Sequence, residues 1–159
     1  MNPKKKSKPL DGHAHEAFVS LMTLAGGLQQ QVKDRMRVDQ PDGLQPLHLR
    51  LLCLCVEQPD NTQQQFAKLL RRDKGQVAHL IHALEARGLL TRTPDPQDGR
   101  VLRMRVTELG AEAAQIFVAM ETELAQEIFG GLTQDQLVDL CALTRLLLEK
   151  ATPADTRAQ

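Results

Sequence analysis

The chain has 159 residues, about 42% of them hydrophobic, and its 20 Lys and Arg are balanced by 20 Asp and Glu. This length suits one domain with a helical extension, and the apolar content is sufficient for an ordinary core. With four Phe, no Trp and no Tyr, the composition excludes a single-strand binder that stacks bases on aromatic platforms.

The N-terminal third predicts a tail and one long helix. Residues 1–10 are Lys-rich without apolar periodicity, so we expect a disordered basic arm. From Phe18 to Met36 apolar residues recur at helical spacing and predict a helix over about 12–37. The turn-forming "QPDG" at 40–43 ends it. We assign residues 11–43 to this N-terminal helix and its connection.

The middle of the chain predicts three helices followed by two strands. Thr62 and Gln65 form a capping box at the start of the third helix of the chain. Asp73 is a good N-cap for the fourth, and Gly88 ends it. The turn-rich "PDPQDG" separates the strands. These elements are expected at about 44–57, 62–70, 74–87, 89–93 and 101–106.

Two more helices complete the chain. The first is expected from Thr107 to about residue 129, and the second begins at a capping box of Thr133 and Gln136 and runs to about 151. Residues 152–159 are expected to form a flexible tail. The element order predicts a mainly α protein with a small β-hairpin, a winged helix-turn-helix over 44–106, and two C-terminal helices over 107–151.

The charges are distributed unevenly along the chain. Residues 65–105 hold nine Lys and Arg against four Asp and Glu, whereas residues 106–159 hold three against nine. Such an asymmetry is informative although the formal net charge is zero. The basic middle favours an anionic partner; a clustering of surface charges without function is the alternative.

The fourth helix has an apolar face and a polar face. Its apolar residues at 3.6-residue spacing, expected in the core, are Val77, Leu80, Ile81 and Leu84. Its outward polar residues, able to donate hydrogen bonds to base edges, are Lys74, Gln76, His79 and His82. Arg71 and Arg72 precede the helix, where phosphate contacts are common. The alternative is the solvated face of an ordinary amphipathic helix.

The hairpin combines an acidic turn with a basic strand. The apolar residues Leu102, Met104 and Val106 share one face of the second strand, and the other face carries Arg103 and Arg105 for solvent or an anion. We expect the Asp98 carboxylate to orient the Arg100 guanidinium through a charge-assisted bond, so that Arg100 suits a narrow minor groove. Arg92 adds charge before the tip. A solvated hairpin with a local surface salt bridge is the alternative.

These residues carry a resemblance to a known family. The segment "GLLTRTPDPQDGRVLRMRVTELG" (88–110) resembles the wing of the MarR family of transcription regulators, with an Arg, D-P-x-D-x-R, a strand and T-x-x-G in order. The segment "DKGQVAHLIHALEARGLL" resembles the family's recognition helix. The resemblance implies that Asp98 and Arg100 act in the wing and that Gln76 and His79 contact DNA. His79 stands where Arg is common, which bears on the base sequence that is read.

The resemblance also implies an assembly and a mode of control. A homodimer is expected from the N-terminal helix and the last two helices, whose apolar stripes a small DNA-binding core would not cover. Two such protomers suit a palindromic operator in double-stranded DNA. We expect a repressor released by a small aromatic or phenolic effector.

Other chemistry is weakly represented. Cys53 and Cys55 point about 200° apart on a helix, and Cys141 falls within an apolar helix face, so buried structural thiols are expected and a thiol switch is the alternative. The histidines that could ligate a metal are His13, His15 and His48. No arrangement meets zinc spacing, and we expect neither a metal nor a cofactor.

Two function classes besides DNA binding remain to be weighed. An enzyme would need an activated nucleophile near a base, and no motif shows one, so we expect no catalytic activity. A winged helix that serves protein association instead of DNA is the second alternative. No apolar run approaches the roughly 18 residues of a membrane span, and no apolar stretch follows the basic N-terminus as in a secretory signal. We therefore expect a cytoplasmic protein.

Overall fold

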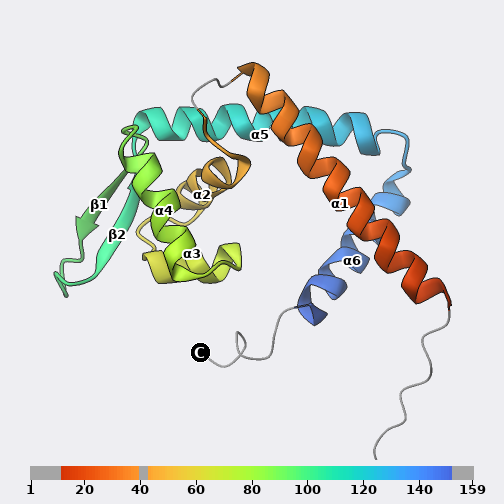
Figure 1. Ribbon diagram of the computed structural model, residues 1–159, viewed down its shortest axis with the longest axis horizontal. Helices are drawn as coiled ribbons and strands as arrows, with labels where there is room; N and C mark the ends of the chain where they lie inside the picture. The colour runs from red at the N-terminus through yellow and green to blue at the C-terminus, as the bar shows by residue number, and fades with distance from the viewer. Residues whose placement is uncertain (1–11, 40–42, 152–159) are drawn as a thin grey trace, which may run out of the picture. The chain divides into compact units, whose positions relative to one another are not determined.

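The structure is a computed structural model that describes residues 12–39 and 43–151. The expected arm at 1–10, the tail at 152–159 and most of the turn at 40–43 lie outside the described residues. The elements, shown in Figure 1, are α1 (Gly12–Asp39), α2 (Pro46–Glu57), α3 (Gln63–Leu70), α4 (Lys74–Glu85), β1 (Leu90–Pro94), β2 (Leu102–Val106), α5 (Glu108–Phe129) and α6 (Gln134–Lys150). The expected mainly helical fold with a β-hairpin is confirmed. The chain divides into two compact units, one containing α1 and one beginning at Leu44.

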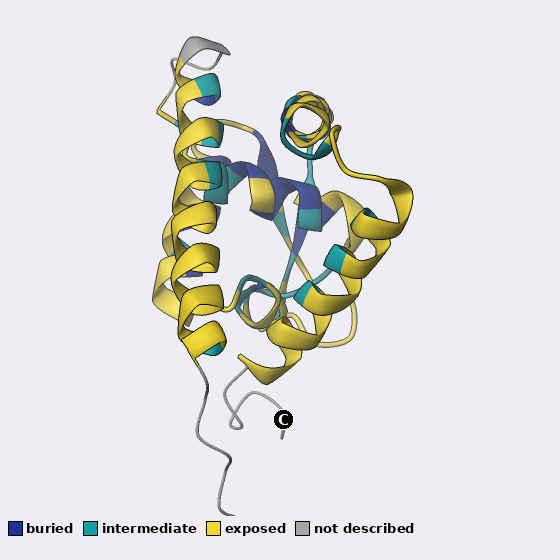
Figure 2. Cartoon of the chain, turned by 90° about the vertical axis from the view of Figure 1, so that its right-hand side faces the viewer, coloured by how far each residue is buried: buried dark blue, intermediate teal, exposed yellow. Residues whose placement is uncertain are grey.

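The first unit is a single uninterrupted helix. It continues through Gly26 and Gly27, where an added Cβ would meet nothing within 4 Å. Among the side chains described for α1, Met36 alone is buried. Phe18 is 62% exposed and Met22 61%, and the burial colouring of Figure 2 shows exposed residues over most of this helix. The apolar stripe predicted from the sequence therefore lies largely uncovered in the single chain.

Side-chain caps begin the helices of the second unit where the sequence predicts them. The Thr62 hydroxyl accepts a hydrogen bond from the Gln65 N–H, and the Asp73 carboxylate accepts one from the Gln76 N–H. Thr107 and Thr133 cap α5 and α6 in the same way. Helix α2 has Pro46 in its first turn, where the missing N–H of proline is not needed.

The core of this unit surrounds α2. Buried residues occur around most of this helix, at Leu49, Leu51, Leu52, Cys53 and Cys55. They pack with α5, α4 and β2 and appear dark blue in Figure 2. The residues predicted for the inner face of α4 are all buried. Two expectations are wrong: Leu102 is 39% exposed and Cys141 is exposed, because strand β2 leaves the core at its tip end and α6 has no cover within the described chain.

The base of the hairpin is joined closely to the start of helix α5. Strands β1 and β2 pair antiparallel, with Leu90 opposite Val106 and Arg92 opposite Met104. The helix α5 approaches so closely that a Cβ on Gly110 would lie 2.0 Å from the Leu89 carbonyl oxygen. The Thr107 hydroxyl donates to the Gly88 carbonyl at 2.7 Å. These two contacts explain the spacing T-x-x-G. The threonine caps α5, and the glycine allows the helix to approach the backbone just before β1.

Candidate nucleic-acid interface

Helices α3 and α4 are joined by a tight turn. The turn residue Arg71 has φ 52° and ψ 46°, in the left-handed region, and Arg72 donates its N–H to the Ala67 carbonyl at 3.0 Å. Asp73 then caps α4. Gln63, at the start of α3, donates its amide to the Lys74 carbonyl at 2.8 Å. These contacts fix the N-terminal end of α4 relative to α3.

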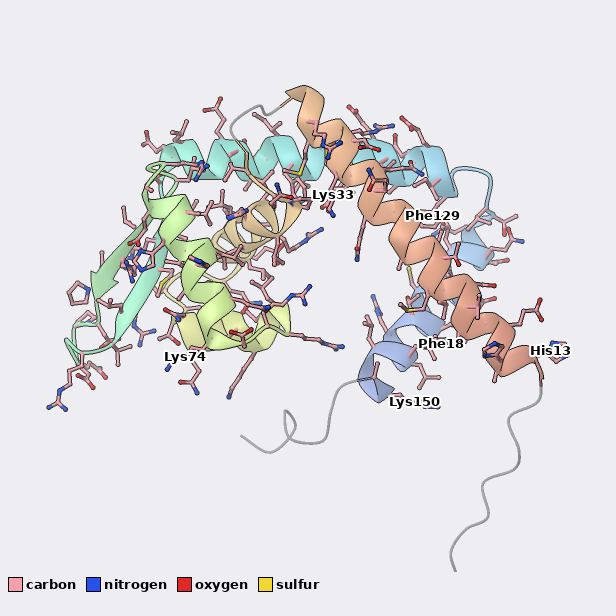
Figure 3. All side chains as sticks on the ribbon, viewed as in Figure 1. His13, Phe18, Lys33, Lys74, Phe129 and Lys150 are labelled. Carbon is pink, nitrogen blue, oxygen red and sulfur yellow. The ribbon has the colours of Figure 1, made fainter. Side chains whose placement is uncertain are left out.

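The outward face of α4 is polar and exposed. The expected contact residues Lys74, Gln76, His79 and His82 are all exposed, and Figure 3 labels Lys74 at the N-terminal end of the helix. The His82 Nδ1 lies 3.8 Å from the Glu85 carboxylate. A face with these groups can donate and accept hydrogen bonds along a DNA groove.

The wing tip is organised by a carboxylate that sequence reasoning missed. Asp95 is 9% exposed, and its Oδ1 accepts hydrogen bonds from the Gln97 N–H at 2.7 Å and the Asp98 N–H at 3.0 Å. Its Oδ2 accepts from the Arg103 guanidinium. These hydrogen bonds lower the pKa of Asp95 below its ordinary value, and the bond from the Gln97 N–H has the largest effect. The signal was present in the sequence, since Asp95 is the first aspartate of D-P-x-D.

Arg100 lies on the wing without the carboxylate partner that the sequence predicts. The Asp98 carboxylate accepts a hydrogen bond from the Arg100 backbone N–H at 3.1 Å, and not from its guanidinium. The turn allows this because Asp98 and Arg100 are two residues apart, which suits a side-chain-to-backbone bond. Among the described residues no ion pair to the exposed Arg100 guanidinium is formed. It is therefore available to an external anion.

The other three arginines of the hairpin are paired within the chain. Arg92 binds the Glu85 carboxylate with two nitrogens, at 2.7 and 2.6 Å, and joins β1 to α4. Arg103 pairs with Asp95, and Arg105 donates to Asp60 at 2.6 Å. The expectation that Arg103 and Arg105 form a free basic face is wrong, because that face meets the turn between α2 and α3.

The two arginines of the helix-turn-helix also differ. Arg71 donates to the Leu148 carbonyl near the end of α6 at 3.3 Å. Arg72 is exposed, and no ion pair of its side chain is formed among the described residues. Of these two expected phosphate contacts, Arg72 is therefore the one that needs no rearrangement.

The buried thiols and the histidines form no reactive site in the described part of the chain. Burial raises the pKa of Cys53, and it raises that of Cys55 to about 12, so both thiols are held in the unreactive form. His48 caps α2 by accepting the Gln45 N–H at 3.0 Å. No group of three or more His, Cys, Asp or Glu among the described residues could hold a metal ion. No described helix is both long and apolar enough to cross a membrane.

Two adjacent helices with a capped second helix, followed by a hairpin whose tip carries an unpaired arginine, define a winged helix-turn-helix domain. Residues 44–102 match the family model described as MarR family. This match confirms, for this segment, the resemblance to the MarR family that the sequence shows.

Comparison with known proteins finds sequence relatives and solved structures of similar fold, including the following three. The repressor IacR of Pseudomonas putida is 33% identical over 61 residues, which are 38% of this chain and 36% of that protein. The match thus spans about a third of its length. A MarR family regulator from Streptomyces coelicolor, solved with DNA, has 21% identity and a TM-score of 0.81, covering 95% of each chain. The regulator PcaV from Streptomyces coelicolor, solved with its natural ligand, has 23% identity and a TM-score of 0.70, covering 92% of this chain and all of that one.

Proposed function

We propose that this protein is a transcription regulator that binds a specific sequence in double-stranded DNA. Helix α4 lies in the major groove and the wing places Arg100 in the adjacent minor groove. The observation that carries this proposal is the contrast within the hairpin: Arg92, Arg103 and Arg105 are paired inside the chain, whereas the Arg100 guanidinium is exposed at the wing tip.

The exposed face of α4 supplies the base contacts in this proposal. Gln76 can pair with adenine through two hydrogen bonds, and His79 can donate or accept at a base edge. Lys74 and Arg72 lie at the N-terminal end, where they bind phosphates and fix the register. Arg92 and Arg103 are paired with carboxylates of the same chain, and in this proposal they hold the wing in place.

A homodimer is the second component of the proposal. Large apolar side chains are exposed on α6 as well as on α1: Leu143 is 58% exposed and Val138 57%. Exposed apolar surface of this extent marks an interaction site. Pairing through these helices gives two copies of α4 for the half-sites of a palindromic operator.

The proposal includes repression that a small aromatic or phenolic ligand relieves. Two relatives support this: IacR is named a repressor, and PcaV was solved with its natural ligand. Control by oxidation of Cys53 or Cys55 is disfavoured, because burial raises the pKa of both thiols.

Fluorescence anisotropy tests the proposal. The purified protein is titrated onto DNA from upstream of its own gene, at several salt concentrations and with scrambled DNA as competitor. We expect competitor-resistant binding, with a slope of log K on log salt of about −0.9 per phosphate neutralised. Equal weak binding to both DNAs calls for selection from random sequences. If selection recovers no consensus, the domain serves association with another protein.

A further inference from the structure

The turn between α2 and α3, residues 58–62, contacts strand β2 at several points. The Met104 N–H donates to the Asn61 carbonyl at 3.0 Å, and Thr62 and Arg103 form an isolated antiparallel bridge. Arg103 also donates to the Asp60 carbonyl at 2.7 Å. The turn therefore lies along strand β2, on the side of β2 that does not pair with β1.

Asp60 adds an ion pair to this edge. Its two carboxylate oxygens accept from the Arg105 guanidinium at 2.6 and 3.2 Å. The hydrogen bonds from this guanidinium to Asp60 raise the pKa of Arg105. Arg105 and Asp60 are 45 residues apart in the chain, so the pair joins the wing to the helical core of the domain.

The backbone at Asp60 adopts a conformation that favours glycine. Its φ is +63°, in the left-handed region that glycine adopts without steric cost. Aspartate tolerates this conformation better than most residues but less well than glycine. The chain thus places a carboxylate where a tight turn favours glycine, and the structure shows that carboxylate bound to Arg105.

We propose that Asp60 is a positioning residue for the wing: by holding Arg105 and Arg103 against the 58–62 turn, it sets the angle at which Arg100 is presented. The part of this inference that concerns DNA rests on the proposed function. Asp60 itself touches no DNA.

This role concerns selectivity more than total affinity. Loss of the Asp60 carboxylate would free the Arg105 cation and remove a negative charge, which strengthens binding to any DNA through the phosphates. The same loss would loosen the wing and lower the advantage of the operator over other sequences. The pair is solvent-exposed, at 60% for Arg105 and 41% for Asp60, so we expect an effect of about two- to fivefold.

Substitutions at Asp60 separate the charge from the backbone. Asp60→Asn removes the charge and keeps a residue that tolerates the left-handed conformation, and Asp60→Gly removes the side chain where glycine is favoured. Glu57→Gln is the matched control, because it removes the same charge from the exposed end of α2, where Glu57 forms no ion pair with any described residue. Arg105→Ala, alone and combined with Asp60→Gly, completes a double-mutant cycle.

Two measurements are made on each full-length variant. Amide hydrogen exchange at Met104, followed by NMR in the protein without DNA, reports how stably the 58–62 turn is bonded to the wing. We expect exchange to be faster by about threefold in Asp60→Gly, intermediate in Asp60→Asn and unchanged in Glu57→Gln. The combined variant should exchange no faster than the more affected single variant. Anisotropy then gives the ratio of operator to scrambled-DNA affinity, which we expect to fall by about threefold with Asp60→Gly.

The outcomes distinguish this inference from the proposed function. Unchanged exchange in Asp60→Gly overturns the positioning role, whatever the DNA result. Faster exchange with an unchanged affinity ratio shows that the wing is held but that its angle does not serve selectivity, which also overturns the inference. If the unsubstituted protein shows no preference for any DNA, the proposed function fails. The hydrogen exchange at Met104 then still tests whether Asp60 holds the wing.

Discussion

At the scale of single residues, the arginines of the hairpin look alike in the sequence but differ in whether they bind a carboxylate of the same chain. Four arginines occur between residues 92 and 105 in an alternating basic pattern. Arg92, Arg103 and Arg105 bind Glu85, Asp95 and Asp60, respectively. A guanidinium that already binds a carboxylate has fewer N–H donors left for a phosphate, whereas no ion pair among the described residues occupies the donors of Arg100.

The first prediction concerns Arg100. Arg100→Ala should lower operator affinity by about tenfold, the usual range for one groove-inserted arginine, because it removes a minor-groove contact. The free energy of unfolding should not change, since Arg100 is exposed. Arg145→Ala, on the exposed surface of α6, controls for the loss of one positive charge. Equal affinities of Arg100→Ala and the unsubstituted protein in anisotropy titrations would exclude Arg100 from the wing contact.

A second prediction at this scale concerns His48. Burial lowers its pKa, and its Nδ1 must be unprotonated to accept the Gln45 N–H. The neutral imidazole is thus favoured in the folded state, and this stabilisation is complete above the unfolded pKa of about 6.5. It is lost as the pH falls from there through the lower folded value.

Urea unfolding between pH 8 and 5 measures this dependence. We expect the free energy of unfolding to fall below about pH 6.5 and His48→Gln to flatten that fall. The control is His13→Gln, because the His13 side chain is 89% exposed. Parallel pH profiles for His48→Gln and the unsubstituted protein would show that another group titrates.

At the scale of elements, local signals predict where helices begin, and long-range contacts decide how the elements meet. Thr62, Asp73 and Thr133 are caps predicted from the sequence and confirmed, because a cap involves residues three apart. The contact of β2 with the 58–62 turn was not predicted. It joins Asn61 to Met104, and no periodicity within either segment encodes that pairing.

The third prediction concerns the junction of α5 with the hairpin. Gly110→Ala would place a Cβ 2.0 Å from the Leu89 carbonyl oxygen, so the helix must move, at a cost of about 3 kcal/mol. Gly26→Ala is the matched control, because a Cβ there meets nothing within 4 Å, and it should stabilise α1 by up to about 1 kcal/mol. Denaturant unfolding measures both, and the proposed junction is wrong if Gly110→Ala leaves the free energy of unfolding unaltered.

At the scale of the whole molecule, the described chain leaves apolar surface without a cover. None of the residues of α6 is buried, and α1 carries Phe18, labelled in Figure 3, at 62% exposure. Each unit by itself thus has a face that water contacts unfavourably. The proposed homodimer, joined through these helices, would cover both faces.

The fourth prediction tests this assembly. Leu143→Glu places a charge on α6 at a side chain that is 58% exposed in the single chain. In a dimer interface that charge is buried, so we expect a monomer and a loss of operator binding. Gln134→Glu introduces the same charge at an exposed position at the start of α6 and should leave the dimer intact. Analytical ultracentrifugation measures the oligomeric state of both variants. If Leu143→Glu remains a dimer, Leu143 does not lie in the dimer interface.

The sequence alone determined the order and type of the elements, three helix caps, the buried face of α4 and the resemblance to the MarR family. These follow from periodicity and from contacts between residues a few positions apart, which a linear pattern records. Only the tertiary structure decided which arginines remain open to an external anion, because Arg103 and Arg105 meet Asp60 across more than 40 residues of chain. It also showed that Asp95, rather than Asp98, holds a guanidinium of the wing. Such pairings depend on how the elements pack, and the spacing of charges in the sequence does not contain that information.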